Sequence, residues 1–351
     1  MTTASPRRGL DTGQPLRISL VGAGAWARTA HLTALAERGG VEFAGVFDPD
    51  RARASATADE FGFATTCDSM DALLAVPADA CIIASPAAHH ADQAIAALRS
   101  GRHVLLEKPM TNSADSAWAI AREAAERDLI VMLAFGWNYS AVFEAAARTL
   151  AAHPIGELEH AVLHMASGTH DLLSGTSTNS SGRDDRPAVS ATWTDPVLSG
   201  GGYGNAQLSH GLGLLFGLVD DAASDLAVIT RPGPRPGIEL GLGVVGRLGD
   251  SATLAVSATS YRQPVRQQLD LRLFGSHGFL GLDLRRDVVW RIDADGSEVV
   301  EQLADGAGAY PGTAPARAFA DLLIGVSTLN ASDATVGART TEVLDAVRAA
   351  A

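Results

Sequence analysis

Lysine is almost absent from this sequence of 351 residues, because 27 positions are basic and only Lys108 among them is a lysine. Acidic residues outnumber basic ones by 40 to 27, which gives a formal net charge of −13. Such a charge disfavours nucleic acid and anionic membrane surfaces as partners. No apolar run approaches the roughly 20 residues that cross a bilayer. We therefore expect neither a nucleic-acid partner nor a membrane anchor.

Cysteine is also scarce. Cys67 and Cys81 have no spacing typical of a metal site, and Cys81 opens an apolar run that suits a buried core residue. We expect no metal, no disulfide framework and a reduced, cytoplasmic location. Residues 1–15 contain arginines but no apolar run after them, so we interpret them as a flexible tail and not as an export signal.

Short apolar runs alternate with helical patterns through the first third of the chain. The predicted strands are 16–21, 41–47, 80–84, 103–106 and 129–134, and the predicted helices are 25–38, 51–61, 89–99 and 113–127. This alternation predicts parallel strands with right-handed crossovers. The expected fold class is α/β, with an N-terminal Rossmann dinucleotide-binding domain over residues 16–137.

The pattern changes from residue 138. A helix at 141–151, a strand at 158–167 and a helix at 206–218 precede several strand candidates between 226 and 292. Those strands lack intervening helices, which predicts an open, mostly antiparallel sheet. Two helices close the chain, at 316–323 and 334–349. We expect residues 138–351 to form a C-terminal α+β domain for substrate binding and oligomerisation.

A glycine-rich motif follows the first predicted strand and opens the first helix. Its residues fit the dinucleotide fingerprint G-x-G-x-x-G/A and are the first cofactor candidates: Gly22, Gly24, Ala25, Trp26 and Ala27. Gly22 permits the tight turn, Gly24 lets the pyrophosphate approach the backbone, and Ala27 lets helix and strand pack closely.

Asp48 ends the second predicted strand, where a carboxylate can accept both ribose hydroxyls of a dinucleotide. NAD(H) is therefore expected in preference to NADP(H). The alternative is that Asp48 caps the next helix. Arg51 and Arg53 lie nearby and keep NADP(H) open, since an arginine can accept a 2′-phosphate.

Lys108 lies in Glu107-Lys108-Pro109, directly after an apolar strand. Ligands of open α/β sheets bind at the carboxyl ends of strands. An ammonium group, unlike a guanidinium, can lose its proton when its surroundings lower its pKa. Lys108 is thus a candidate acid/base, and a chance surface lysine is the alternative.

These motifs together resemble the Gfo/Idh/MocA family of sugar and polyol oxidoreductases, over nearly the whole chain from residue 16. The resemblance rests on the fingerprint and on Ala84-Ser85-Pro86 with His89-His90, Glu107-Lys108-Pro109, and Gly200-Gly201-Gly202 with His210. It implies hydride transfer between nicotinamide and a carbinol carbon of a sugar, keto-sugar or cyclic polyol. It also implies a homodimer or homotetramer formed through the outer face of the C-terminal sheet.

The resemblance assigns site residues as well. Ser85, Pro86, His90, Glu107 and Lys108 are expected to line the NAD site, and Lys108 and His210 are expected to be catalytic and to face the substrate. Either of these two groups can carry the proton that hydride transfer at a carbinol requires.

One position departs from the family pattern. Many members have Asp four residues before the catalytic His, where this chain has Ala206. Tyr203 and Gln207 are candidates to supply hydrogen bonds instead, and a purely structural His210 is the alternative. The absence of this Asp also leaves room for a regulator without activity.

Four further residues are candidate substrate contacts. Asn138 and Tyr139 follow the last Rossmann strand, His164 is expected on the cleft side of strand 158–167, and Trp193 is placed to stack on a sugar ring. Packing is the alternative for both Tyr139 and Trp193. A second enzymatic hypothesis is a protein that retains NAD and oxidises its substrate transiently, for elimination or glycoside cleavage.

Overall fold

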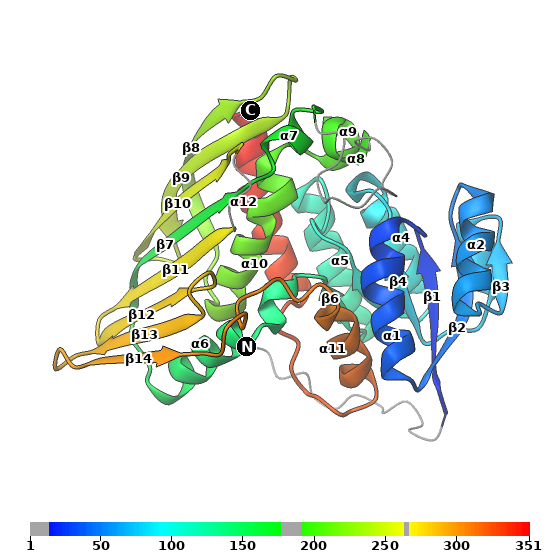
Figure 1. Ribbon diagram of the computed structural model, residues 1–351, viewed down its shortest axis with the longest axis horizontal. Coiled ribbons are helices and arrows are strands. Elements are labelled where there is room, and N and C mark those ends of the chain that lie inside the picture. Colours follow the sequence, from blue (N-terminus) through cyan, green and yellow to red (C-terminus); the bar gives the residue numbers. More distant parts are fainter. Residues whose placement is uncertain (1–13, 177–190, 263–266) are drawn as a thin grey trace. The chain divides into compact units, whose positions relative to one another are not determined.

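The computed structural model describes residues 14–176, 191–262 and 267–351, and the chain divides into two compact units (Figure 1). The first unit runs to Tyr139 and includes residues 311–338, and the second contains residues 140–310 and 339–351. The first break falls beside the predicted boundary at 137–138. Residues 311–338 differ from the prediction, since they belong with the N-terminal unit.

The first unit contains a six-stranded parallel sheet in the order β3-β2-β1-β4-β5-β6. Its strands are β1 (Leu16–Val21), β2 (Val41–Phe47), β3 (Thr65–Cys67), β4 (Ala80–Ile83), β5 (His103–Leu106) and β6 (Val131–Leu133). The order reverses between β1 and β4, which is the point where Rossmann sheets bind dinucleotides. The predicted α/β fold is confirmed.

Helices connect these strands. They are η1 (Ala27–Leu32, a π-helix), α1 (Thr33–Arg38), α2 (Arg51–Phe61), α3 (Met70–Ala75), η2 (Ala87–His89), α4 (His90–Arg99), α5 (Ala114–Arg127) and η3 (Gly136–Tyr139). The predicted helix at 25–38 therefore contains a π-helical turn. Asp50 caps α2 by accepting a hydrogen bond from the backbone N–H of Arg53, and Gly62 ends α2 in the left-handed conformation.

Helix α11 (Ala314–Leu323) belongs to the first unit because of its apolar face. Phe319 and Leu323 share one hydrophobic core with Leu32 and Leu35 of the first helical segment. The segment that follows α11 also bonds to β6, since the backbone N–H of Leu133 donates to the carbonyl of Ser332 at 2.7 Å. Because these contacts join residues far apart in the chain, no local sequence pattern predicts that residues 311–338 belong to the first unit.

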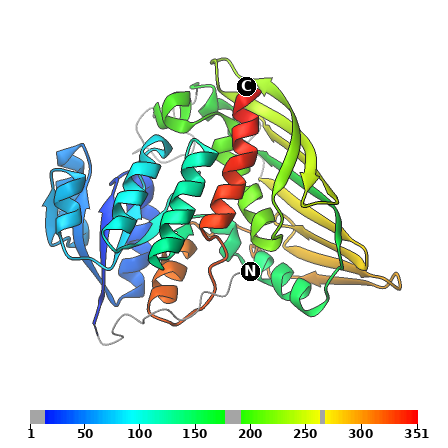
Figure 2. The ribbon, with the colours of Figure 1, turned by 180° about the vertical axis from the view of Figure 1, so that it is seen from behind.

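The second unit contains an eight-stranded sheet in the order β14-β13-β12-β11-β7-β10-β9-β8 (Figures 1 and 2). Its strands are β7 (Leu158–Ser167), β8 (Ala223–Pro232), β9 (Glu239–Leu248), β10 (Ala252–Ser260), β11 (Gln268–Gly275), β12 (Gly278–Asp283), β13 (Val288–Asp293) and β14 (Glu298–Gln302). Of the described pairs, β7 with β10 is parallel and the others are antiparallel. The predicted mostly antiparallel sheet is confirmed.

Helices cover one face of this sheet. The helical segments of the second unit are α6 (Ala141–Ala152), α7 (His170–Leu173), α8 (Ala191–Thr194), α9 (Pro196–Ser199), η4 (Gly204–Leu208, a π-helix), α10 (Ser209–Leu218) and the end of α12 (Ala334–Ala349). Alternate residues of β10 are buried, including Leu254 and Val256, while Thr253 and Ser257 are exposed. This period of two means that one face is packed and the other faces outward.

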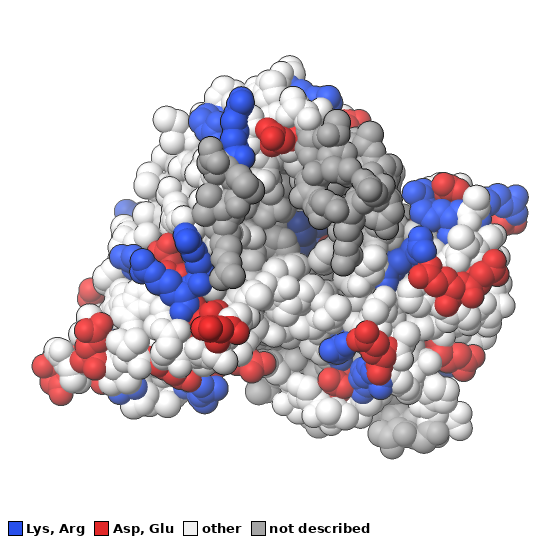
Figure 3. Space-filling view, in the orientation of Figure 1, with Lys and Arg blue, Asp and Glu red and all other residues white. Residues whose placement is uncertain are grey.

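Charged side chains of both signs lie next to one another on the face shown in Figure 3. Many charged side chains of the described residues are paired, including Arg17 with Asp79 at 2.9 Å and Arg148 with Glu301 at 2.9 Å. Within the described ranges, no helix is both long enough and apolar enough to cross a membrane.

Candidate functional site

The turn of residues 22–27, called here the first glycine turn, follows β1 at the carboxyl edge of the parallel sheet. Gly22 has a φ of +86°, and a Cβ there would lie 2.6 Å from the backbone nitrogen of Ser85. This position therefore requires glycine for both conformation and space. At Gly24 a Cβ would meet no described atom within 4 Å. Packing against the described part of the protein does not require that glycine, and the open space fits a pyrophosphate.

Asp48 lies at the end of β2, buried beside the first glycine turn. Its Oδ2 accepts a hydrogen bond from the Ala23 N–H at 2.8 Å, and its Oδ1 accepts one from the Asp50 N–H at 2.8 Å. Arg53 adds a bidentate contact, with Nε 3.1 Å from Oδ2 and Nη2 3.0 Å from Oδ1. The capping alternative is wrong, because Asp50 and not Asp48 caps α2.

Ser85, Pro86 and His90 form the turn after β4. His90 is buried, with Nε2 2.8 Å from the Ser85 carbonyl and Nδ1 3.0 Å from the Pro109 carbonyl. Burial lowers the pKa of His90, although these carbonyls act in the opposite direction. His90 thus ties the turn after β4 to the turn after β5. Pro86 precedes η2, and the Ser85 hydroxyl donates to Gln93 Oε1 at 2.5 Å.

Glu107 is the centre of a buried network at the end of β5. Its Oε1 accepts hydrogen bonds from Trp26 Nε1 and His31 Nε2, both at 2.8 Å, and its Oε2 accepts one from the Lys108 N–H at 3.0 Å. Burial favours the neutral acid, but His31 and Lys108 lower the pKa of Glu107 below its ordinary value. Burial lowers the pKa of Lys108, and Glu107 opposes that shift. Sequence reasoning did not identify His31.

In the second unit, residues 200–204 form a second glycine turn before the His210 helix. The N–H groups of Gly202 and Gly204 donate to Glu239 Oε2 and Oε1 at 2.8 and 2.6 Å. A Cβ at Gly202 would lie 2.2 Å from the Glu239 carbonyl oxygen, so glycine is required there. Burial raises the pKa of Glu239, and the two N–H groups act against that rise. Sequence reasoning did not identify Glu239 either.

His210 lies in the first turn of α10 and is buried. Its ring packs edge-on against Tyr310, with ring centroids 5.0 Å apart and planes inclined by 74°. Ala206 lies in η4, four residues before His210. Gln207 Oε1 is 3.4 Å from Gln267 Nε2. No sequence motif pointed to Tyr310, which lies in a loop 100 positions further along the chain.

Tyr203, a candidate to supply a hydrogen bond beside His210, is fully buried. Its hydroxyl accepts a hydrogen bond from Ser167 at 3.1 Å, and burial raises its pKa.

Asn138 donates to the Ala331 carbonyl at 2.8 Å, and the Tyr139 hydroxyl lies 2.7 Å from Ser332 Oγ. These contacts agree with the packing alternative for Tyr139.

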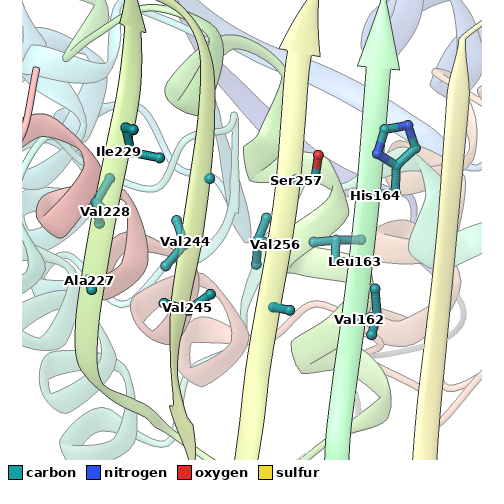
Figure 4. A pocket seen from close by; sticks show the side chains of 12 residues that line it. Val162, Leu163, His164, Ala227, Val228, Ile229, Val244, Val245, Val256 and Ser257 are labelled. Carbon is teal, nitrogen blue, oxygen red and sulfur yellow. The ribbon is translucent and has the colours of Figure 1, made fainter.

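His164 lies on the outer face of β7, which differs from the predicted cleft side. Its neighbours Leu163 and Met165 are buried and approach Gly211 of α10, so the alternation along β7 turns His164 away from that helix. It lines a hollow on the sheet together with Val162 (Figure 4).

Trp193 is half-buried in α8. No group of three or more His, Cys, Asp or Glu side chains in the described ranges is arranged to hold a metal ion.

The strand order of the first unit, the glycine turn after β1 and the acid after β2 define a dinucleotide-binding Rossmann domain. Residues 16–135 match the model of the Gfo/Idh/MocA oxidoreductase family, described as "Oxidoreductase family, NAD-binding Rossmann fold". The N-terminal domain therefore matches the NAD-binding domain of this family, and the resemblance predicted from the motifs is confirmed over residues 16–135.

Similar proteins agree with this assignment. The chain is 41% identical to D-xylose 1-dehydrogenase (NADP(+)) 2 of Haloferax volcanii over 111 residues, which are 31% of this chain and 34% of that protein. It is 33% identical to inositol 2-dehydrogenase of an Arthrobacter species over 150 residues, which are 41% of this chain and 44% of the other. These matches span less than half of either relative.

The fold is shared over the full length with solved structures. GenD2 from gentamicin A biosynthesis, solved in complex with NAD, superposes with a TM-score of 0.72 over 98% of this chain and 96% of that one. The sequence identity is 20%, so this similarity shows the fold.

Proposed function

We propose that this chain is an NAD(P)-dependent oxidoreductase acting on a carbinol carbon of a sugar, keto-sugar or cyclic polyol, with NAD(H) preferred. The observation that carries the proposal is a Rossmann edge with an open glycine turn, a buried Asp48 at the end of β2 and the chain's one lysine after β5. A bound nicotinamide cofactor supplies hydride acceptance or donation there. The names of the similar dehydrogenases of xylose and inositol support the substrate class.

The chain itself must supply proton transfer, because oxidation of a carbinol releases a proton from its oxygen. Lys108 is the first candidate, since burial lowers its pKa and so raises the neutral fraction of the amine near neutral pH. His210 is the second, because imidazole titrates in the physiological range and the Tyr310 ring restrains its orientation. Glu107 holds the backbone of Lys108 in place.

The test is a panel of sugars and cyclic polyols with NAD+ and NADP+, followed by nicotinamide absorbance. Lys108→Arg should abolish turnover and leave cofactor binding within a few-fold, because guanidinium cannot shed its proton. His210→Asn should lower kcat by at most about a hundredfold, the low part of the range for general acid–base catalysis.

Other outcomes would contradict the proposal. Near-normal kcat in Lys108→Arg would reduce the lysine to an electrostatic or structural role. Consumption of a substrate without net nicotinamide reduction would identify an enzyme that oxidises transiently. Cofactor and sugar binding without any turnover would identify a regulator.

We also propose that the outer face of the eight-stranded sheet forms a homo-oligomer contact. Ile229 and Val245 are 74% and 58% exposed on this face. They line a hollow of about 390 Å³ together with Gly243 and Ala255. Figure 4 shows Ile229 and Val245 at this hollow. An exposed apolar patch of this kind is typical of a protein interface. In sedimentation velocity, Val245→Arg should dissociate the assembly, whereas Val326→Arg, at a valine that is 70% exposed outside this sheet, should not.

A further inference from the structure

Three segments of the first unit meet at the carboxylate of Glu107. Trp26 comes from the first glycine turn, His31 from the π-helix η1, and the Lys108 N–H from the residue after β5. The contacts join residues that are 81 and 76 positions apart in the sequence. Glu107 is buried, so its three hydrogen bonds replace the water that the carboxylate would otherwise bind.

The hydrogen bonds define the charge of this network. Both indole and imidazole donate to Oε1, which suits an ionised carboxylate better than a neutral acid. His31 is 1% exposed, and among the described residues no hydrogen-bond partner reaches its Nδ1. A second N–H at Nδ1 would be buried without an acceptor, so the Nε2–H tautomer fits this site. The Glu107 carboxylate therefore supplies a negative charge to this network.

That charge acts on Lys108. The titratable groups that interact electrostatically with the Glu107 carboxylate are Lys108, His31 from η1 and His90 from α4. Both ring nitrogens of His90 lie at backbone carbonyls, Nε2 at Ser85 and Nδ1 at Pro109. The Glu107 carboxylate is then the group that counters the effect of burial on the pKa of Lys108.

We propose that Trp26 and His31 are positioning residues that fix the Glu107 carboxylate and, through it, the charge state of the Lys108 amine. Trp26 belongs to the glycine turn that fits a pyrophosphate, so one carboxylate joins the cofactor turn to the lysine. The inference rests on the proposed function, in which Lys108 handles the proton. It adds the residues that tune that lysine.

The single lysine makes a direct test possible without a substrate. The folded protein is labelled with dinitrofluorobenzene across a pH series, and the peptide between Arg102 and Arg122 is quantified by mass spectrometry. The reagent attacks the neutral amine, so the pH midpoint reports the pKa of Lys108. The α-amino group of the same chain is the internal control.

Glu107→Gln should lower the midpoint, because a negative charge beside the amine is removed. At a pH below the midpoint, labelling should accelerate by about tenfold for each unit of the fall. His31→Leu and Trp26→Phe should shift the midpoint in the same direction by less, since each removes one donor from the carboxylate. His31→Gln should restore the wild-type midpoint because its amide N–H replaces the Nε2–H.

Matched controls separate this role from general packing. His89→Leu changes an exposed histidine of η2, and Trp118→Phe changes a tryptophan of α5; both should leave the midpoint unchanged. Trp26 is 42% exposed, so Trp26→Phe is expected to fold even if His31→Leu does not.

Two results would overturn the inference. One is an unchanged Lys108 midpoint in folded Glu107→Gln and Trp26→Phe. The other is an equal shift in His31→Leu and His31→Gln, which would show that ring packing and not the donor matters. A parallel titration with NAD(H) and NADP(H) tests the proposed function separately, since absent cofactor binding would refute that function whatever the labelling shows.

Discussion

Replacing Arg53 with alanine should move cofactor preference further towards NAD(H). Asp48 accepts four hydrogen bonds, two from the N–H groups of Ala23 and Asp50 and two from the Arg53 guanidinium. A carboxylate offers about four lone-pair sites. A ribose diol can therefore bind Asp48 only if the Arg53 guanidinium moves away from the carboxylate. The Arg53 side chain is 45% exposed, so it is able to swing outward.

The expected magnitudes differ for the two cofactors. An ion pair with one exposed partner contributes about 0.2–1 kcal/mol, so its loss should tighten NAD(H) binding by at most roughly fivefold. A 2′-phosphate would instead lose a charge-assisted hydrogen bond worth about 1.5–3 kcal/mol, which is roughly tenfold or more in affinity. In Arg53→Ala the 2′-phosphate would also be repelled by the Asp48 carboxylate, because the Arg53 guanidinium no longer pairs with it. The ratio of the two affinities should therefore change by more than about tenfold.

Calorimetric titration of both cofactors measures this ratio. Arg51→Ala is the matched control, because Arg51 lies two positions earlier in α2 and pairs with the exposed Asp68. Equal weakening of both cofactors in Arg53→Ala would show that Arg53 merely holds Asp48 in place. Tighter binding of NADP(H) than of NAD(H) by the wild type would refute the preference drawn from Asp48.

Three further predictions concern stability. Gly22→Ala should destabilise the first unit by about 1–3 kcal/mol, because a left-handed φ costs that much for a non-glycine residue, and the Cβ contact with Ser85 adds to it; thermal unfolding measures the loss. Glu239→Gln should cost about 1–3 kcal/mol in urea unfolding, since one buried glycine N–H loses its acceptor. The pKa of Glu107 is lowered on folding, so its stabilisation is complete above the unfolded value of about 4.3 and is lost as pH falls. As the pH falls from about 4.3 towards the lower pKa of Glu107 in the folded state, the free energy of unfolding should fall more in the wild type than in Glu107→Gln.

The strands that build the Rossmann sheet could be predicted because they are buried on both faces. The bounds of β1, β2 and β5 agree with the sequence prediction, since fully covered parallel strands appear as continuous apolar runs. Strand β3 was missed because it is short and two of its residues, Thr65 and Thr66, are exposed. Strand β14 was missed for a similar reason, since it is an edge strand with mostly exposed side chains.

Some residues of the candidate site could be predicted from the sequence and others could not. Gly22, Asp48 and Lys108 could be predicted, because each directly follows a strand and its role depends on that position. His31 and Glu239 could not, since the bonds that define their roles join residues 76 and 35 to 37 positions apart. An acid at the start of the apolar strand β9 was the available signal for Glu239. A histidine within an apolar helix face is compatible with ordinary core packing, so His31 gave no comparable signal.

The two units use the same physical solution to hold a glycine turn. In the first unit Glu107 accepts from Trp26 in the turn, and in the second Glu239 accepts from Gly202 and Gly204. Each turn leads into a π-helical segment, η1 or η4. Burying a carboxylate is costly unless donors satisfy it. The donor is the Trp26 indole in the first turn, and in the second turn it is a pair of closely spaced glycine N–H groups. The turn and the distant glutamate therefore depend on each other, and a motif of glycines alone describes only half of each structure.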